Sequence, residues 1–435
     1  MVKVVKFGGS SLANAAQLRK VRAIVLADDA IRAVVVSAPG KDAANDKKIT
    51  DLLYRCCDSV NDVESFNAAF DVVRARFAAI DGTLGLGVDM EAEFSAIRAR
   101  CAEDFSASWL VSRGEYLTAK LVAACLGFTF VDAADWLCFD FDKKVDVHLS
   151  YKKFREIMEK HERVVTPGFY GVLPSGEVHL FPRGGSDLTG AYAAAALRAD
   201  MYENWTDVPG ILMADPKVID APKPIARITY DELRELSYMG AVVVHAETVF
   251  PLLTNGIPLH IRNTNDPAAP GTRVDEAVPD RVGGFVTGIA GKQHYSILSI
   301  YKNGMSGHSK YVRRALEACE KRGVNVEHIP KGIDDFALVV SGASLRGCLD
   351  GLLADIKAEC EPDLIDVAHG MSLIAVVGAR MARQPGVAGQ LFGALGAAGI
   401  SIRIIEQGAA ERSIIFGVAD ADFERSIRVL YDSFS

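Results

Sequence analysis

The sequence predicts an α/β protein in two parts: an αβα sandwich around a largely parallel sheet, followed by two ferredoxin-like βαββαβ units. Strand-like and helix-like segments alternate from residue 1 to about residue 282 of the 435-residue chain. Such alternation is typical of a parallel sheet covered by helices. The remainder contains an internal repeat, and similar segments at a fixed spacing indicate duplicated units.

In the first part, short apolar runs predict strands, and longer segments with apolar residues at helical spacing predict helices. The predicted strands are Val2–Val5, Ala33–Ala38, Phe128–Val131, Val164–Thr166, Val178–Phe181 and Met201–Trp205. The predicted helices are Leu12–Leu26, Thr50–Ile80, Met90–Ser106, Tyr151–Glu162 and Asp187–Leu197. We expect a loop at 265–272, which is rich in proline and glycine, and a domain boundary near residue 283.

The repeat in the C-terminal part has a spacing of 76 residues. Gly323–Ile329 is similar to Gly399–Ile405 (399 − 323 = 76). In each copy a helix is followed by two strands and a second helix, which is a split βαβ arrangement. We expect the copies at residues 283–360 and 361–435.

Composition limits the classes of function. Hydrophobic residues make up 49% of the chain and charged residues 24%, as in soluble globular proteins. A net charge of −8 without any basic stretch argues against nucleic-acid binding, and no apolar run is long enough to span a membrane. The eight cysteines are scattered without a CxxC pair. We therefore expect reduced thiols in a cytoplasmic protein without a signal peptide, and neither a zinc site nor a disulfide framework.

The N-terminal segment Lys6-Phe7-Gly8-Gly9-Ser10-Ser11 points to a phosphate site. A strand that ends in a glycine-rich turn before a helix directs backbone N–H groups at one place, where they bind phosphate. Lys6 adds a positive charge beside them. The GxxxxGK[ST] spacing of a Walker loop is missing. The alternative is a surface turn with a solvated lysine.

Four more segments complete a recognisable pattern: Val34–Ala38, Ser112–Glu115, Arg183–Asp187 and Thr206–Gly210. Together with Lys6–Ser11, and in this order, they resemble the aspartate kinases of the amino-acid kinase family over the whole chain. The resemblance implies ATP-dependent phosphorylation of the β-carboxylate of L-aspartate to 4-phospho-L-aspartate, the first step of lysine, threonine and methionine biosynthesis. It also implies that the repeat is a pair of interleaved ACT domains, which are regulatory modules that bind amino acids.

Phosphoryl transfer to a carboxylate needs positive charge rather than a general base. The carboxylate nucleophile has a pKa near 4 and is already ionised at neutral pH. The obstacle is its repulsion from the polyphosphate, which positioning and cations overcome. Lys6 is the candidate that bridges the transferring phosphate. Phe7, Gly8, Gly9 and Ser10 complete the predicted nucleotide contact.

Arg183 is the candidate for the substrate carboxylate, because a guanidinium group binds a carboxylate at two points. It follows the predicted strand Val178–Phe181, and α/β sheets place ligands at the carboxyl ends of strands. A surface arginine is the alternative. Ser186 adds a hydroxyl to the same carboxylate. Asp187 either caps the helix that it precedes or, as the resemblance implies, organises the active-site cations, and the two roles are compatible.

Three further residues are substrate-binding candidates mainly through the resemblance. Glu115 would pair with the ammonium group of aspartate, as the resemblance implies, although the local sequence alone favours an ordinary glutamate at a helix start. Thr50 reads equally as a helix N-cap. Ser37, at the end of a buried strand, is the weakest of the three.

The resemblance places nucleotide contacts after the strand Met201–Trp205. Thr206 and Asp207 match the nucleotide-binding turn of the family, and Leu212 and Lys217 lie in a loop that contacts the adenine and phosphates. The cofactor would be ATP with Mg²⁺, the metal being held mainly through the phosphates. The sequence departs from the usual residues here, with Leu212 for tyrosine and Lys217 for arginine. Other departures are Asn265 for lysine and Pro182 for the glycine before Arg183.

The first ACT unit is the predicted site of feedback control. The loop 303–307 precedes a helix expected to begin at His308, and its N–H groups are suited to the carboxylate of an effector. Asn325 offers an amide that both donates and accepts. The predicted allosteric residues are Met305, Ser306, His308, Tyr311, Asn325 and Val326. The resemblance to the family favours lysine over threonine as the effector. It also implies a homodimer or a dimer of dimers through the ACT domains.

Three alternatives stay open. One is another kinase of the family, acting on glutamate, acetylglutamate or a nucleotide. The second is an amino-acid sensor with a degenerate kinase domain, and the third is a generic αβ binding protein. The segment Gly393–Gly399 has GxxGxxG rather than GxGxxG spacing and closes a helix. We interpret it as a glycine helix end and expect no fused homoserine dehydrogenase domain.

Overall fold

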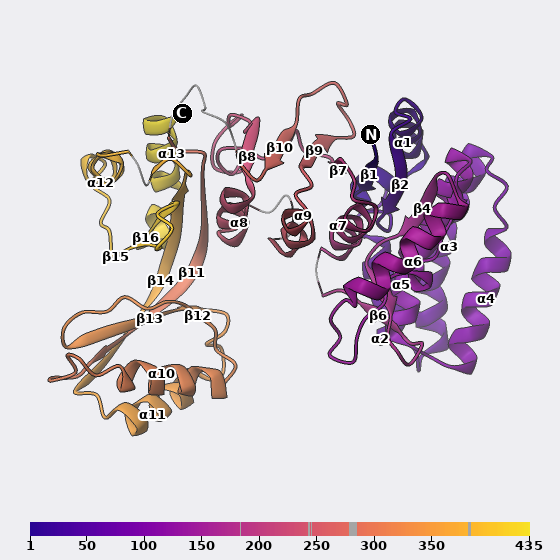
Figure 1. The fold of residues 1–435 in the computed structure, drawn as a ribbon. Coiled ribbons are helices and arrows are strands. Elements are labelled where there is room, and N and C mark those ends of the chain that lie inside the picture. The colour runs from indigo at the N-terminus through magenta and orange to yellow at the C-terminus, as the bar shows by residue number, and fades with distance from the viewer. Residues whose placement is uncertain (183, 242–243, 245, 278–284, 382–383) are drawn as a thin grey trace. The chain divides into compact units, whose positions relative to one another are not determined.

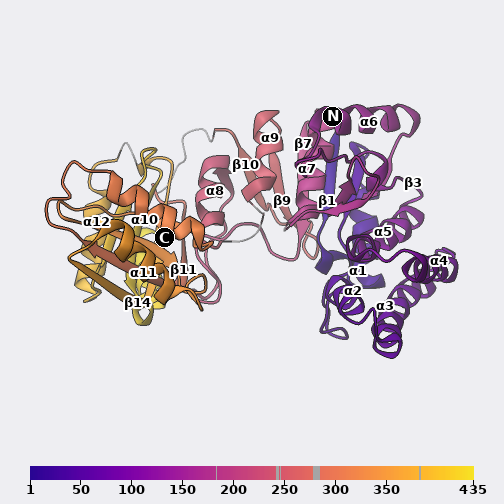
Figure 2. The ribbon, with the colours of Figure 1, turned by 90° about the horizontal axis from the view of Figure 1, so that it is seen from below.

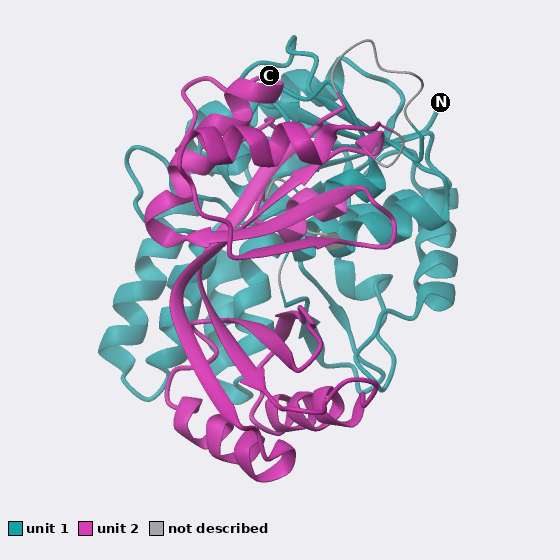
Figure 3. Cartoon of the chain, turned by 90° about the vertical axis from the view of Figure 1, so that its left-hand side faces the viewer, with its two compact units in different colours: residues 1–211, 224–233, 243–279 teal, residues 212–223, 234–242, 280–435 magenta. Residues whose placement is uncertain are grey.

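The structure is a computed structural model that describes residues 1–182, 184–241, 244, 246–277, 285–381 and 384–435. The chain divides into two compact units, coloured separately in Figure 3. Unit 1 contains residues 1–211, 224–233 and 243–279, and unit 2 contains residues 212–223, 234–242 and 280–435. Two short segments before residue 243 therefore group with the C-terminal part of the chain.

Unit 1 is built on an eight-stranded sheet with the order β3-β4-β2-β1-β7-β9-β10-β8 (Figure 1). Its strands are β1 (Lys3–Phe7), β2 (Ile31–Val36), β3 (Thr129–Phe130), β4 (Val164–Pro167), β7 (Met201–Thr206), β8 (Arg227–Thr229), β9 (Leu259–Asn263) and β10 (Thr272–Asp275). All neighbouring strands are parallel except β9 and β10. Because β1 lies between β2 and β7, the turn after β1 meets the carboxyl ends of both neighbours, where such sheets place ligands.

Helices cover both faces of this sheet, as the predicted αβα sandwich requires. The helix α5 packs on β2 and β4, whereas α7 packs on β1, β2 and β7. The helices are α1 (Ala15–Leu26), α2 (Ile49–Asp58), α3 (Val63–Leu84), α4 (Met90–Glu103), α5 (Ala107–Leu126), α6 (Val147–Lys160), α7 (Gly185–Leu197), α8 (Tyr230–Tyr238) and α9 (Val249–Thr254). The last residues of α8 belong to unit 2.

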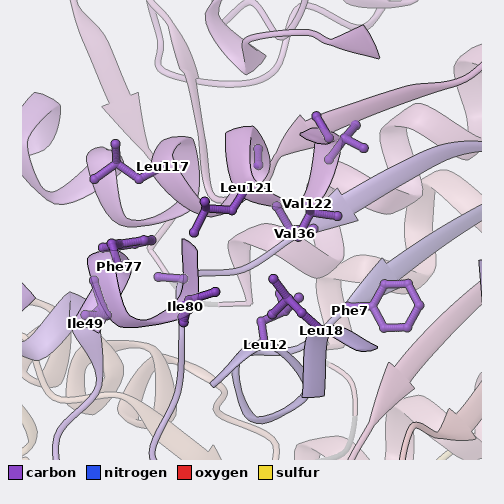
Figure 4. Close-up of a cluster of buried hydrophobic side chains, with 14 of the residues drawn as sticks. Phe7, Leu12, Leu18, Val36, Ile49, Phe77, Ile80, Leu117, Leu121 and Val122 are labelled. Atoms are coloured by element: carbon purple, nitrogen blue, oxygen red, sulfur yellow. The ribbon is translucent and has the colours of Figure 1, made fainter. Parts of the chain in front are cut away.

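A large hydrophobic core fills the layer between the sheet and the helices α1 to α5. Phe7 of β1 and Val36 of β2 lie in it with Leu18, Phe77 and Leu121 from three different helices (Figure 4). Successive side chains of a strand point to opposite faces. The burial of Phe7 in this layer therefore directs its neighbour in β1, residue 6, to the other face, on which α7 packs.

Two predicted elements of unit 1 differ clearly from the structure. The segment predicted as one helix, Thr50–Ile80, forms α2 and α3, because Asp62 caps a new helix by accepting from the N–H groups of Glu64 and Ser65. The predicted strand Val178–Phe181 forms β6 (Val178–Leu180). It pairs antiparallel with β5 (Tyr170–Val172) in a separate two-stranded sheet, and not in the main sheet.

Unit 2 contains one six-stranded sheet with the order β12-β13-β11-β14-β16-β15. Its strands are β11 (Gly288–Tyr301), β12 (Val326–His328), β13 (Asp335–Ser341), β14 (Leu364–Val377), β15 (Ile404–Gln407) and β16 (Ser413–Ala419). The helices are α10 (Lys310–Lys321), α11 (Leu349–Cys360), α12 (Val387–Ala397) and α13 (Phe423–Phe434). Gly399 follows α12 with a φ of 68°, as expected for a glycine that ends a helix.

Both repeats share the two long central strands. The strands β11 and β14 have 14 residues each and pair antiparallel, with an irregular register between Lys292 and Ile297. The second half of β11 also pairs with β13, and the second half of β14 pairs with β16. The first repeat is therefore inserted between strand segments that belong to the second.

Each repeat has its own pair of helices. The helices α10 and α11 contact each other (Figures 1 and 2), and so do α12 and α13. Residues of α10, α11, β11 and β13 form one hydrophobic core. All eight cysteines are free thiols. Within the described part of the chain, no helix has the length and apolar character needed to cross a membrane.

Candidate active site

Lys6 and Asp187 form the centre of the candidate site. The Nζ atom of Lys6 lies 2.6 Å from Oδ1 of Asp187, and the two side chains are 10% and 14% exposed. Asn204 of β7 donates its amide to the same Oδ1 atom at 3.0 Å. Asp187 is the third residue of α7, whose N-cap is Gly184, so the prediction that Asp187 precedes and caps the helix is wrong. Its carboxylate instead meets the lysine across the sheet–helix boundary.

Asn204 is a site residue that the sequence analysis missed. It lies beside Lys6 in the parallel pairing of β1 with β7. It is 2% exposed, and its contact with Asp187 fixes the orientation of that carboxylate. The available signal was an asparagine inside the predicted strand Met201–Trp205, since a polar side chain that a covered sheet buries is nearly always hydrogen-bonded.

The glycine turn after β1 packs directly on neighbouring backbone. Gly8 is the N-cap of a short 3-10 helix, Gly9–Leu12, and donates to the carbonyl oxygen of Trp205 at 3.0 Å. A Cβ atom on Gly9 would lie 2.7 Å from the carbonyl oxygen of Ala38. Any residue with a Cβ atom would therefore clash here, and glycine fits because it has none. A Cβ atom on Gly8 would lie 3.5 Å from Nζ of Lys6. Glycine at this position therefore has no side-chain atom in contact with the ammonium group of Lys6.

Glu115 is buried in the middle of α5, so the interpretation as a helix-start glutamate is wrong. The backbone N–H of Ala38 donates to its carboxyl group. Its Oε2 atom is buried and has no hydrogen-bond partner among the described residues. Burial raises the pKa of Glu115 to about 8, although Ala38 and the charge of Arg113 act in the opposite direction. An unpaired buried carboxyl group of this kind is suited to a cationic ligand.

Ser37 begins the loop that connects β2 with α2, and Thr50 lies just beyond the other end of this loop. Ser37 directly follows β2 and donates its N–H to the carbonyl oxygen of Phe7 at 3.2 Å. Thr50 is the second residue of α2, and Lys48 is the N-cap, so the N-cap interpretation of Thr50 is wrong. A Cβ atom on Gly114 would lie 3.2 Å from a methyl group of Ile49. The start of α2 thus packs on α5 one residue away from Glu115.

Ser186 belongs to the same edge of the sheet. It is the second residue of α7 and is 8% exposed. A Cβ atom on Gly168 would lie 2.6 Å from that of Ser186, and the N–H of Gly168 donates to the carbonyl oxygen of Val36. The start of α7 is therefore in contact with the ends of β4 and β2. Arg183 lies outside the described residues.

The predicted nucleotide residues are divided between the units. Thr206 ends β7, and its hydroxyl donates to Asp207 at 3.2 Å. The carbonyl oxygen of Thr206 accepts from the N–H of Thr264, and the hydroxyl of Thr264 bonds with that of Ser11 at 2.8 Å. The ends of β1, β7 and β9 therefore form one edge. Leu212 and Lys217 belong to unit 2.

The predicted effector loop is largely occupied by contacts within unit 2. The N–H groups of Asn303 and Gly304 donate to the carboxylates of Asp363 and Asp334, at 2.7 and 3.0 Å. Met305 donates to the carbonyl oxygen of Lys302, and its side chain is completely buried. Met305 therefore has neither its amide nor its side chain available to an effector, contrary to the prediction.

The helix after this loop begins at Lys310 and not at His308. Gly304 and Gly307 have φ values of 73° and 79°, and these left-handed residues extend the turn. Of the other predicted allosteric residues, three are exposed and two are half-buried. The exposed ones are Ser306, His308 and Asn325, and the half-buried ones are Tyr311 and Val326.

The site has a lysine and a glycine turn at the carboxyl edge of a parallel sheet, with a carboxylate beside the lysine. This fold and site are typical of a phosphotransferase. The chain matches the amino acid kinase family over residues 1–263 and the ACT domain over residues 374–434. The chain therefore belongs to the amino acid kinase family.

Relatives that match this chain over its full length identify the reaction within the family. Aspartokinase 3 of Bacillus subtilis (strain 168) is 36% identical over 100% of this chain and 98% of that protein. The structure of Clostridium acetobutylicum aspartate kinase is 39% identical, covers 100% of both chains and has a TM-score of 0.90. Aspartokinase III of E. coli, in complex with aspartate and ADP, is 25% identical over 100% and 99% of the two chains, with a TM-score of 0.81. The activity of the chain is that of an aspartate kinase.

Proposed function

We propose that a β-carboxylate oxygen of L-aspartate attacks the γ-phosphorus of ATP, with ADP as the leaving group, at the edge that carries Lys6. The single observation that carries this assignment is the pairing of Lys6 with Asp187 beside the glycine turn. Lys6 would stabilise the negative charge that develops on the transferred group. Asp187 would hold the ammonium group of Lys6 in place, and Asn204 would hold the carboxylate of Asp187.

The residues at this edge fit ATP. Gly8 has no side chain beside the lysine, and α7 and the 3-10 turn at Gly9 both begin near this edge, where helix starts are suited to phosphate. We propose that Mg²⁺ binds mainly through the phosphates, with Asp187 as the nearby carboxylate, and supplies further positive charge there. Thr206 and Asp207, with Leu212 and Lys217, are the proposed contacts to the rest of the nucleotide.

Aspartate would bind between α5, α7 and the end of β2. Glu115, whose Oε2 atom has no partner among the described residues, would accept from the substrate ammonium group. Arg183 and Ser186 are the proposed partners of the substrate carboxylate, with Ser37 and Thr50 as further contacts. The solved complex of E. coli aspartokinase III with aspartate and ADP supports this pair of ligands.

We further propose a kinase domain at residues 1–282 and two ACT units that share β11 and β14. The pairing of these strands, whose register is irregular between Lys292 and Ile297, supports a first unit at about 295–368 that is inserted in the second, instead of at 283–360. Lysine is the proposed effector and threonine the second choice. E. coli aspartokinase III was solved with lysine and aspartate in the T-state, and it is 26% identical to this chain. A homodimer or dimer of dimers and a cytoplasmic location stay predictions.

The test is ADP release by the purified chain with ATP and Mg²⁺, using L-aspartate, L-glutamate or no acceptor. We expect turnover that requires aspartate and falls when lysine is added. Turnover with glutamate alone would favour another kinase of the family. Lysine binding without any turnover would favour a sensor with a degenerate kinase domain.

A further inference from the structure

The loop 40–47, between β2 and α2, lies directly against the proposed phosphate turn. The N–H of Gly40 donates to the carbonyl oxygen of Gly9 at 2.8 Å. A Cβ atom on Gly40 would lie only 2.7 Å from the carbonyl carbon of Gly9. The two backbones are therefore in contact with no side chain between them, and a displacement of the loop displaces the turn.

One guanidinium group holds both ends of this loop. Arg76 of α3 donates from one terminal nitrogen to the carbonyl oxygen of Gly40, and from the other to that of Lys47, each at 2.7 Å. The two carbonyl groups are seven residues apart (47 − 40 = 7). The planar fork of arginine presents both donors in a fixed geometry, whereas lysine ends in a single nitrogen.

The burial of Arg76 is unusual for a residue whose hydrogen-bond acceptors are neutral carbonyl oxygens. Arg76 is 7% exposed, and its Nε atom is buried without a hydrogen-bond partner among the described residues. Burial lowers the pKa of Arg76, and only the charge of Asp42 acts in the opposite direction. A buried cation of this kind is costly. An apolar residue at this position of α3 would avoid that cost.

Both ends of the loop lead to proposed substrate contacts. Ala38, two residues before Gly40, donates its N–H to Glu115. Lys47 directly precedes the N-cap of α2, and Thr50 lies in the first turn of that helix. The contacts of Arg76 are therefore placed between the phosphate turn and the aspartate contacts.

We infer that Arg76 is a positioning residue, which holds the loop 40–47 so that the Gly9 turn and the aspartate contacts keep their catalytic arrangement. The inference rests on the proposed function. Arg76 does not touch the reacting groups and acts through the backbone of Gly40 and Lys47.

The test compares Arg76→Lys and Arg76→Met with Arg74→Met. Arg74 lies on the same helix in an exposed ion pair with Glu91 and serves as the matched control. Each variant is measured for kcat and KM with aspartate and ATP, and for amide hydrogen exchange. Small misplacements at a distance from the chemistry cost up to about 100-fold in rate. We expect Arg76→Lys to lose about 10-fold in kcat/KM and to exchange faster at 40–48, with no change in the rest of α3.

The outcomes separate the two proposals. Absence of aspartate-dependent turnover in the wild-type chain would count against the proposed function itself. An active wild-type chain with an Arg76→Lys variant of equal kcat, equal KM and equal exchange at 40–48 would overturn the positioning role. Unfolding of both Arg76 variants would also overturn it, because the guanidinium group would then serve folding rather than position. Arg74→Met should match the wild type, and an equal loss in that variant would again mean a general effect of α3.

Discussion

Single side chains decide the chemistry of the site, and Lys6 is the first of them. Its ammonium group lies in contact with Asp187 near the end of the central strand, where it is largely shielded from water. Electrostatic interactions are stronger in such surroundings than in bulk water. Glu115 is the opposite case, since it is a buried carboxyl group without a cation in ion-pair contact among the described residues.

We expect Lys6→Ala to lower kcat by at least about 100-fold, because the variant lacks the charge that stabilises the transferring phosphoryl group. The fold should persist, since Asn204 still donates to the carboxylate of Asp187. ADP release and far-UV circular dichroism would measure the two effects. Near-normal turnover in a folded variant would exclude Lys6 from the phosphate site.

We expect the affinity for aspartate to rise with pH up to about 8 and then to level off. The pKa of Glu115 is raised from 4.5 to about 8, so the free carboxyl group is mainly protonated at pH 7. A substrate ammonium group favours the ionised form, and binding below pH 8 therefore releases a proton. Calorimetric titration at pH 7, in two buffers of different ionisation enthalpy, would detect the release.

Glu115→Gln is the control for this pH dependence. The variant should bind aspartate more weakly and should release no proton from this position. The same shift makes Glu115 lower the stability of the free protein as pH rises from 4.5 to 8, because only the folded state binds the proton in that range. Proton release of equal size in Glu115→Gln would show that another group titrates.

Arg183→Ala should raise the KM for aspartate roughly 10- to 100-fold and leave the KM for ATP nearly unchanged. The lost contact is a charge-assisted hydrogen bond between guanidinium and carboxylate, which contributes roughly 1.5–3 kcal/mol. Initial rates over a matrix of both substrates would measure the two constants. Equal effects on aspartate and ATP would indicate a structural role.

At the scale of elements, the site depends on backbones that approach each other without side chains. The turn at Gly9 packs on Ala38 and Gly40, and the end of β4 packs on the start of α7. These contacts connect β1, β2 and β4 at one edge of the sheet, and they explain why glycine occurs in each of these turns.

Gly9→Ala and Gly82→Ala should have opposite effects on stability. A Cβ atom on Gly9 would lie 2.7 Å from a carbonyl oxygen, and overpacking of this kind costs about 1–3 kcal/mol. Gly82, inside α3, has no neighbour within 4 Å of such an atom, so alanine should stabilise the helix by roughly 0.5–1 kcal/mol. Urea unfolding would measure both changes, and a stable, active Gly9→Ala variant would contradict the close packing of this turn.

For the whole molecule, regulation requires that an effector binds one arrangement of the chain more tightly than another. Asn325 is exposed and directly precedes β12, in the first repeat. Asn325→Ala should therefore raise the lysine concentration needed for half-inhibition and leave uninhibited turnover unchanged. Titration of lysine and threonine against both proteins would test this. Identical inhibition curves would remove Asn325 from the effector site.

The fold class, the repeat and the family could all be predicted from the amino-acid sequence. The signals were local or periodic: the alternation of strand and helix patterns and the 76-residue spacing. Such signals can be read from one sequence without a structure. Lys6 and its glycine turn were also identifiable, because one strand–turn–helix segment contains all their chemistry. The exact helix starts at Thr50, Asp187 and His308 were wrong, since caps and left-handed glycines shift boundaries by a few residues.

Contacts between residues far apart in the sequence could not be predicted and are seen only in the folded chain. The burial of Glu115 in the middle of α5, the contact of Asn204 with Asp187 and the two carbonyl contacts of Arg76 join segments far apart in sequence. The same holds for β11 and β14, which both repeats share. The local propensities of residues do not predict such contacts. Burial and hydrogen bonding between distant segments arise only when the sheet and its helices pack together.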